Sequence, residues 1–366
     1  MIKIIAVGDI MPGGLLSGSD HPCADNNVLD LLRDGDVRCG TLECALGNNP
    51  TYDQEKVADR GNVIYAKDED VKRLKELHIN VVSLANNHFF DLGKDGARHT
   101  IALLDREGIL HCGAGSDLHE AGKPAVIETG GKRIAFIGFC DTVYSHVFWC
   151  TYATENSPGV NPLRIDYCLS EIKKYAALYD YVVVMAHWGN EHTFSPNVST
   201  VKMAKKMLKA GACLVLGSHP HRIQPVINTK MGSIAFSMGN FLFPERLIAP
   251  PKVTWYPEGE IDYSSLPTTK GYPIVDRITL KSLPFWARVG QIVKTQIGEA
   301  GSVSEYRFSF LTASNCLSLL DKNKCEVAQK RISRVGWWIK LGLYQPYFMS
   351  KKVSQAILAR IKRILK

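Results

Sequence analysis

Two histidines, His219 and His221, flank a proline in the segment 217–221, directly after the apolar run 212–216. Glycine, serine and proline keep this segment from continuing as a helix. If the backbone is extended as in a strand, histidines two positions apart direct both rings to one side. Imidazole nitrogens are common metal ligands, so the pair indicates a metal site more strongly than either histidine would alone.

Four other segments with ligand-type residues also follow apolar runs: Gly8-Asp9, Glu43, Asn86-Asn87-His88 and His187. Each has an ordinary explanation by itself, such as a turn after a strand, a solvated acid, a local Asx turn or a packed core imidazole. Together they form a pattern, because sites in open α/β sheets gather outside the carboxyl ends of the strands. The sequence therefore predicts that these residues converge on one centre.

The chemistry of this predicted centre follows from its donor atoms. Oxygen would come from three residues and nitrogen from three others, namely Asp9, Glu43 and Asn87, and His187, His219 and His221. Such a mixed set suits Mn²⁺, Fe or Zn²⁺ better than Ca²⁺ or Mg²⁺. We therefore expect one or two divalent metal ions, which would attract a phosphate or a carboxylate.

An α/β layered fold is predicted to position these residues, because short β-branched runs alternate with helical patterns up to about residue 240. The predicted strands are 2–7, 37–42, 63–66, 81–84, 125–128, 134–138, 181–186, 213–216 and 233–237. The predicted helices are 26–33, 68–77, 93–107, 164–178 and 198–210. Residues 244–272, rich in proline and aromatics, are predicted to form a long loop or lid, and residues 274–312 a strand meander.

The composition is that of an ordinary globular protein, with 366 residues of which 45% are hydrophobic and 22% charged. The ten cysteines include no CxxC pair, which favours reduced core thiols in a cytoplasmic protein over a zinc ribbon. The first nine residues predict a strand rather than a signal peptide. No apolar stretch approaches the ~20 residues of a transmembrane helix.

The C-terminal segment is strongly basic. Residues 322–366 contain twelve Lys or Arg and a single acid, Glu326, so that the remaining chain carries a formal charge of −3. One interpretation is a helix that packs on the domain and exposes a basic face. Another is association with an anionic membrane surface at the inner face of the membrane. Nucleic acid is an unlikely partner in this interpretation, because no recognised nucleic-acid fold accompanies the charge.

Six segments carry a resemblance to a known family, in family order: Gly8–Met11, Leu42-Glu43, 83–88 with Asp91 and Gly93 after it, 186–189 with Glu191, 217–221 and 237–241. On these motifs, residues 1 to about 243 resemble the CapA family, poly-γ-glutamate capsule biosynthesis proteins related to calcineurin-like metallophosphoesterases. The resemblance implies a four-layer α/β/β/α sandwich. We accordingly expect a domain over 1–315, which includes a lid or insertion loop at 244–272, and a basic amphipathic helical extension over 316–366.

The resemblance also implies roles for the site residues. Asp9 and His221 would hold one metal, and Glu43 would bridge to a second metal that Asn87, His187 and His219 also hold. His88, followed by Asp91, would protonate a leaving group or hold a phosphoryl oxygen. From their places beside the ligands, Arg222, Glu191 and Trp188 are candidates to bind substrate. A surface salt bridge is an equal alternative for Arg222, and a place in the core is an equal alternative for Trp188. Position 11 is Met, where the wider superfamily has a histidine, so the first metal would lack one nitrogen ligand.

Two functions stay open at this point. The first is a cytoplasmic metal-dependent hydrolase of an anionic phosphoester or related cell-envelope or capsular polymer, in capsule or exopolymer biosynthesis. The second is a non-catalytic metal-containing component of a polymer synthesis or export complex at the membrane. A membrane-recruited adaptor that works through the tail is a third and weaker alternative. The sequence does not choose among phosphoester, acyl phosphate and amide, and it leaves the oligomeric state open.

Overall fold

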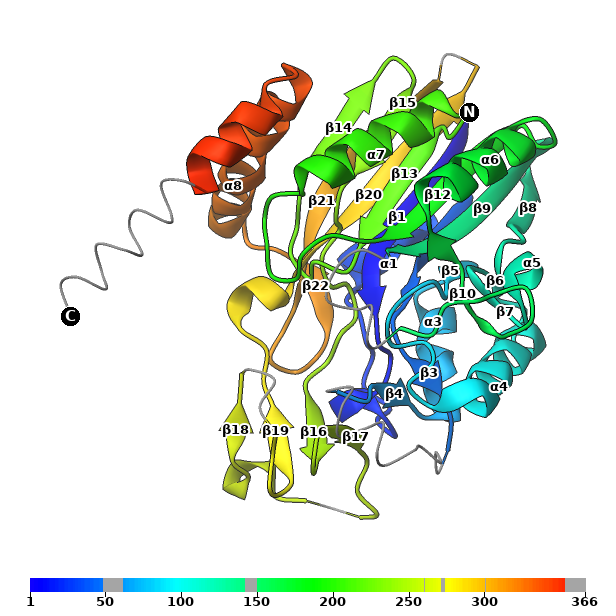
Figure 1. Cartoon of the computed structure of the whole chain (residues 1–366). Helices are drawn as coiled ribbons and strands as arrows, with labels where there is room; N and C mark the ends of the chain where they lie inside the picture. The colour runs from blue at the N-terminus through cyan, green and yellow to red at the C-terminus, as the bar shows by residue number, and fades with distance from the viewer. Residues whose placement is uncertain (49–61, 142–149, 260, 271–273, 300, 353–366) are drawn as a thin grey trace.

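The computed structural model describes residues 1–48, 62–141, 150–259, 261–270, 274–299 and 301–352. Its centre consists of two large sheets (Figure 1). The first sheet has the order β22 (Leu317–Leu319), β21 (Gly301–Leu311), β20 (Val289–Gly298), β1 (Ile2–Ile10), β2 (Val37–Leu42), β5 (Val81–Ser83) and β6 (Leu110–Cys112). The second has the order β11 (Pro162–Leu163), β9 (Lys132–Asp141), β12 (Tyr181–His187), β13 (Leu214–Ser218), β15 (Gly232–Ala235) and β14 (Val226–Thr229), and β8 (Ala125–Thr129) pairs with β9.

The strands that lead to the candidate ligands are parallel to their neighbours. In the first sheet β1, β2, β5 and β6 run in parallel, and in the second β9, β12, β13 and β15 do so. Their burial is nearly continuous along the strand, as expected for parallel strands that are covered on both faces. The carboxyl ends of each parallel set therefore lie at a common sheet edge.

Helices cover the outer faces of both sheets. α1 (Asn26–Arg33), α3 (Lys72–Glu76) and α4 (Gly93–Arg106) share a hydrophobic cluster with β1, β2 and β5. α6 (Ile165–Ala176) and α7 (Val198–Lys209) share another cluster with β9, β12 and β13. Between the sheets lies a third cluster, to which Ile4 and Val37 contribute from one sheet and Phe136 and Val183 from the other. The order of layers is thus α/β/β/α, as expected.

Smaller elements complete the fold. The pairs β3 (Ala45–Leu46) with β4 (Tyr65–Ala66), and β7 (Ala114–Gly115) with β10 (Gly159–Val160), form two-stranded sheets. The described chain also contains the helices α5 (Leu118–Ala121) and α8 (Lys322–Lys340), with short 3₁₀ turns at Gly14–Leu16, Asp68–Val71, Tyr263–Ser265 and Phe285–Ala287. All ten cysteines are free thiols.

The segment 244–272 differs from the predicted loop, because it contains strands. β16 (Arg246–Ala249), β17 (Val253–Trp255) and β18 (Thr268–Thr269) join β19 (Thr279–Lys281) in a small four-stranded sheet. Pro250 and Pro251 occupy the turn between antiparallel β16 and β17, where proline costs no ladder hydrogen bond. The Tyr256 hydroxyl donates to Tyr65 O at 2.8 Å and accepts from Gly14 N at 3.1 Å, so this side chain is fixed to the body of the domain.

The C-terminal region also departs in detail from the expectation. β22 lies after the predicted boundary at residue 315, yet it pairs with β21 in the first sheet. α8 follows from Lys322 and lies beside β14 (Figure 1). The last part of the predicted amphipathic helix, residues 353–366, lies outside the described residues. Within the described part of the chain, no helix combines the length and the apolar character that crossing a bilayer requires.

Candidate metal centre

Strand ends from both sheets bring the six predicted ligands together. Asp9 is the second-last residue of β1, Glu43 directly follows β2, and Asn87 comes shortly after β5. His187 ends β12, and His219 directly follows β13. The end of β1 is also held against a loop of the second half of the chain, because Asp9 N donates to Gly239 O at 3.0 Å and Phe241 N donates to Asp9 O at 2.9 Å.

One group of donor atoms surrounds His187. Its Nε2 lies 2.7 Å from Asn87 Oδ1, 3.1 Å from His219 Nδ1 and 3.6 Å from Glu43 Oε1. Its Nδ1 shares a 2.9 Å hydrogen bond with Ser218 Oγ, which fixes the orientation of the ring. Glu43, His187 and His219 can therefore offer ligand atoms within 4.8 Å of one another.

A second group surrounds His221. His221 Nδ1 lies 3.5 Å from Asp9 Oδ2, and His221 Nε2 lies 3.5 Å from Glu43 Oε1. Asn240 Oδ1 lies 2.7 Å from His221 Nδ1. Asp9, Glu43 and His221 again place ligand atoms within 4.8 Å of one another. Glu43 belongs to both groups, in the position that a bridging carboxylate would occupy.

The electrostatics of the centre call for a cation. Asp9 and Glu43 are fully buried, and Asp9 Oδ1 and both Glu43 oxygens accept no hydrogen bond from the described residues. Burial raises the pKa of Asp9 to about 8, and burial together with the charge of Asp9 raises the pKa of Glu43 well above its usual range. Burial also lowers the pKa of His221 to about 3, so this imidazole is neutral and can act as a ligand. Two buried carboxyl groups beside imidazole nitrogens fit a divalent metal ion.

The two histidines converge by a different route from the predicted one. Their backbone is not extended: His219 has φ 92° and His221 has φ 49°. Non-glycine residues rarely adopt this left-handed region, and they do so mainly where the surroundings enforce it. The rings end 5.9 Å apart, centroid to centroid. The two rings thus lie close together, but the strand-like geometry behind the prediction was wrong.

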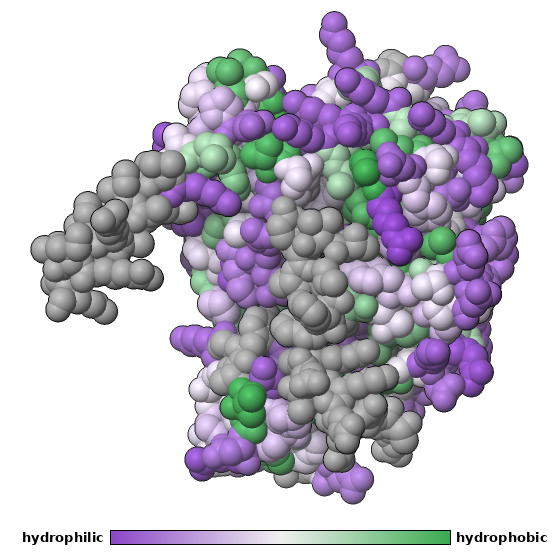
Figure 2. Space-filling model, in the orientation of Figure 1, coloured by the Kyte–Doolittle hydropathy of each residue, from purple (hydrophilic) through white to green (hydrophobic). Residues whose placement is uncertain are grey.

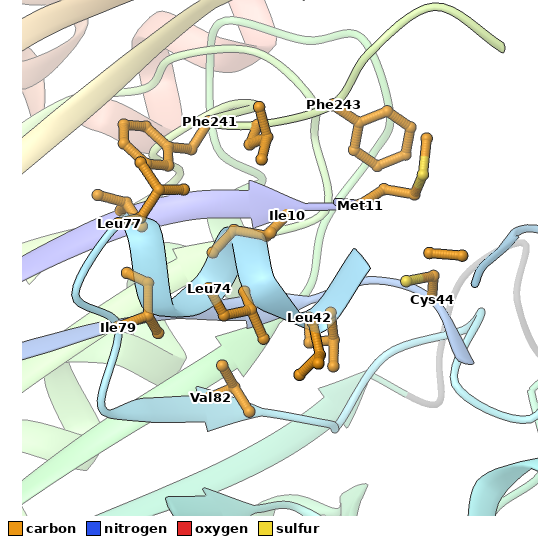
Figure 3. Packing of buried hydrophobic residues seen from close by; sticks show 14 of the residues in the cluster. Ile10, Met11, Leu42, Cys44, Leu74, Leu77, Ile79, Val82, Phe241 and Phe243 are labelled. Carbon is orange, nitrogen blue, oxygen red and sulfur yellow. The ribbon is translucent and has the colours of Figure 1, made fainter. Parts of the chain in front are cut away.

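Position 11 contributes nothing polar to the centre. Met11 is fully buried in the cluster that covers the outer face of the first sheet. Figure 3 shows it among Ile10, Cys44 and Phe243, with the sulfur directed away from Ile10. The ligand that a histidine would supply at this position is therefore replaced by hydrophobic packing.

His88 and Asp91 form a pair at the edge of the centre. His88 Nδ1 lies 2.7 Å from Asp91 Oδ2, and the same oxygen accepts a hydrogen bond from Ile64 N at 2.7 Å. Asn86 Oδ1 accepts from His88 N at 3.0 Å. The His88 side chain keeps 16% of its surface exposed. Asp91 thus orients a partly accessible imidazole beside the candidate ligands.

The three residues predicted to bind substrate have different places. Glu191 can join His219 and His221 in a third group of potential ligand atoms, so it lies at the centre itself. Arg222 lines a cavity of about 100 Å³ next to His221. Trp188 is buried in the cluster between the second sheet and α6 and α7, where Nε1 donates to Phe236 O at 2.9 Å. Its assignment to substrate binding is corrected, because it faces the core.

The sequence reasoning missed several residues around this cavity, among them Asn240, Arg246 and Lys281. Arg246 and Lys281 are cross-strand partners in the antiparallel pair β16 and β19, and both are almost completely buried. Burial and the charge of Arg246 lower the pKa of Lys281 to about 8. Asn240 belongs to the motif 237–241. Arg246 and Lys281 lie in or beside the segment predicted as a loop, where no motif or periodicity marked them.

Comparison with known proteins gives a consistent set of relatives. The family described as "Bacterial capsule synthesis protein PGA_cap" matches residues 3–245. The capsule biosynthesis protein CapA of Bacillus anthracis is 32% identical over 67% of this chain and 60% of its own length. The PGA biosynthesis protein CapA of Bacillus subtilis (strain 168) is 34% identical over 65% of this chain and 62% of its own length. The match thus spans about three fifths of these relatives.

More distant similarities also exist. A probable polyglutamine synthesis accessory protein of Mycobacterium tuberculosis is 30% identical over 46% of this chain and 47% of its own length. A crystal structure of a protein from Thermus thermophilus covers 65% of this chain and 89% of that protein, with 12% identity and a TM-score of 0.32.

Proposed function

The chain belongs to the PGA_cap family of bacterial capsule synthesis proteins, and we propose that it is a metal-dependent hydrolase of an anionic phosphoester or related cell-envelope polymer in capsule or exopolymer biosynthesis. The observation that carries this proposal is the convergence of Asp9, Glu43, Asn87, His187, His219 and His221, with buried carboxylate oxygens that no donor among the described residues satisfies. Bound divalent ions would supply positive charge and Lewis acidity at that point.

The residues of the chain would supply the other parts of the reaction. His88 would donate a proton to the leaving oxygen as water adds to phosphorus and the ester bond breaks. Asp91 would hold the Nδ1 proton of that ring and so present Nε2 to the substrate. Ser218 would keep His187 in its ligating orientation. These roles follow from contacts that each residue makes.

The cavity beside His221 supports an anionic substrate. The cavity is lined by four cationic side chains, Arg222, Arg246, Lys270 and Lys281. Burial is the main cause of the raised pKa of Glu191 nearby. Guanidinium and ammonium groups in a poorly solvated cavity attract phosphate and carboxylate alike. The cavity therefore favours an oxyanion without choosing between a phosphoester and a polymer of carboxylates.

Hydrolysis of two phosphate esters by metal-loaded protein tests the proposal, together with metal content by elemental mass spectrometry. Asp9→Ala and His221→Ala should lower both metal content and turnover at least about tenfold, whereas His119→Ala, an exposed histidine on α5, should change neither. His88→Ala should lower the turnover of an alkyl phosphate by about 10²–10⁴ and that of nitrophenyl phosphate much less, because nitrophenolate leaves without a proton. Wild-type protein that cleaves neither ester, with metal content unchanged in both ligand variants, would refute it.

A second function has one specific observation in its favour. Because Met11 packs in an apolar cluster, the group formed by Asp9, Glu43 and His221 lacks a nitrogen ligand at this position. This lack would weaken the binding of one of the two metal ions. In that case the centre would bind polymer or stabilise the fold within a synthesis or export complex. His219→Ala would then reduce polymer binding or thermal stability in a protein that shows no turnover.

A further inference from the structure

The helix α8 has two apolar faces. Its inner face carries Ala328, Ile332, Val335 and Ile339, which are nearly or fully buried against the domain. The guanidinium of Arg331 lies 4.5 Å from the ring centroids of both Phe194 and Trp286. These contacts fix α8 to the body of the protein, so its other face is presented in a defined direction.

The segment after α8 folds back and strengthens this attachment. Trp338 stacks on Tyr347 with ring centroids 5.3 Å apart. The buried Tyr344 donates its hydroxyl proton to Pro196 O at 2.6 Å. The helical unit from Lys322 to Lys352 is therefore anchored over its length, and it is not a freely moving tail in the described structure.

The outer face of α8 is apolar and basic at the same time. Val327 and Trp337 on the helix are exposed by 51% and 55%, and Leu341, the C-cap residue of α8, is exposed by 49%. Lys330 and Arg334 lie between them at helical spacing, on the side opposite Ile332 and Val335. Two further exposed apolar residues, Leu343 and Met349, follow the helix. Figure 2 shows hydrophobic and hydrophilic groups side by side at the upper left, where Figure 1 places this unit.

The charge of the unit distinguishes it from the rest of the protein. Residues 322–352 contain eight Lys or Arg and one acid, Glu326, whereas residues 1–321 carry a formal charge of −3. Water would solvate these cations whether or not apolar residues lay beside them, so solvent exposure alone does not account for Trp337 and Leu341. Tryptophan next to lysine and arginine on one helix face is the pattern that suits the boundary between lipid headgroups and acyl chains.

We propose that the outer face of α8, defined by Val327, Lys330, Arg334, Trp337 and Leu341, docks on an anionic lipid bilayer. Trp337 and Leu341 would enter the headgroup boundary, and Lys330 and Arg334 would pair with lipid phosphates. This mode of binding is peripheral and needs no spanning helix. The bilayer surface is favoured over a second copy of the chain because a basic face repels its own copy. The inference is independent of the proposed hydrolysis, since no residue of the metal centre takes part.

Co-sedimentation of the full chain with vesicles tests the proposal. Vesicles of phosphatidylcholine alone are compared with vesicles of equal parts phosphatidylcholine and phosphatidylglycerol. We expect binding to the anionic vesicles only, and a decrease as salt is added. Lys330→Gln with Arg334→Gln should weaken it about twenty-fivefold, since each cation near an anionic surface contributes about fivefold. Trp337→Ser should also weaken it.

The matched control is Lys202→Gln with Lys206→Gln, a pair of exposed lysines at the same spacing on α7. This variant loses the same charge and should bind vesicles like the wild type. Equal binding by all variants would overturn the proposal. So would a Trp337→Ser protein that changes from dimer to monomer in light scattering with unaltered vesicle binding, which would identify a second copy as the occupant. Tighter binding to a DNA duplex than to anionic vesicles would overturn it as well.

Discussion

Replacement of Glu43 by glutamine should have opposite effects on stability with and without metal. In the metal-free protein, the two oxygens of Glu43 are fully buried beside Asp9, and no donor among the described residues satisfies them. A glutamine of the same shape carries no charge at any pH, so it replaces a carboxyl group whose pKa burial and Asp9 raise far above its usual range, and it offers an amide donor to Asp9. We expect the metal-free variant to be more stable than the wild type by about 1–3 kcal/mol.

Metal reverses the order. A metal at a thousand times its dissociation constant stabilises the wild type by about 4.1 kcal/mol, which exceeds the advantage of the metal-free variant. For 366 residues, an unfolding entropy of about 2 cal/mol/K per residue converts this into a rise in Tm of about 6 °C. Glu43→Gln removes the anionic ligand shared by both groups of donor atoms, so its Tm should stay nearly constant when metal is added.

Calorimetric Tm values with a chelator and with added Mn²⁺ or Zn²⁺ measure both effects. Glu128→Gln, which changes an exposed glutamate on β8, serves as the control and should show the metal response of the wild type. The reasoning is refuted if Glu43→Gln is less stable than the wild type in chelator and still gains the same few degrees from metal.

Two further predictions concern the walls of the site. Trp188→Phe should lower the free energy of unfolding by about 1–3 kcal/mol, because the buried Phe236 carbonyl loses its donor. Metal content and turnover should stay unchanged. A rise in KM alone would indicate that Trp188 contacts the substrate. Gly8→Ala should destabilise the protein by about 1–3 kcal/mol or more and reduce its metal content, because the new Cβ would lie 1.8 Å from Gly239 O. The control Gly336→Ala in α8, where the nearest atom would lie 3.4 Å from the new Cβ, should change neither quantity. A stable Gly8→Ala protein with full metal content would count against the close approach of the two segments.

The main layers could be predicted from the sequence because their periodicity is local. The helix 26–33 and the strand 37–42 have the predicted bounds, and the helix 93–107 ends one residue earlier than predicted. The strands of the segment 244–272 have only two to four residues, which is too short for a hydrophobic period to be read between prolines. Their pairing depends on contacts between distant parts of the chain.

The candidate ligands could be identified because each follows an apolar strand, and parallel strands bring their carboxyl ends to one edge. Of the two interpretations of Trp188, a substrate wall or a core residue, the core place is favoured for an equally local reason. Successive side chains of a strand point to opposite faces, so when His187 faces the centre, Trp188 faces the helices. Arg246 and Lys281 became neighbours only through the register of β16 and β19, which the sequence alone did not reveal. The catalytic and ligand roles themselves stay predictions.

The distribution of the donor atoms between the two sheets has a consequence for folding. Asp9, Glu43 and Asn87 lie at or after the ends of strands of the first sheet, and the three histidines lie at or after the ends of strands of the second. Neither half of the chain carries a complete coordination set before the sheets have docked. Tight metal binding should therefore occur late during refolding, once the two sheets have docked. Mutations in the apolar layer between the sheets should delay metal binding even though they leave every ligand unchanged.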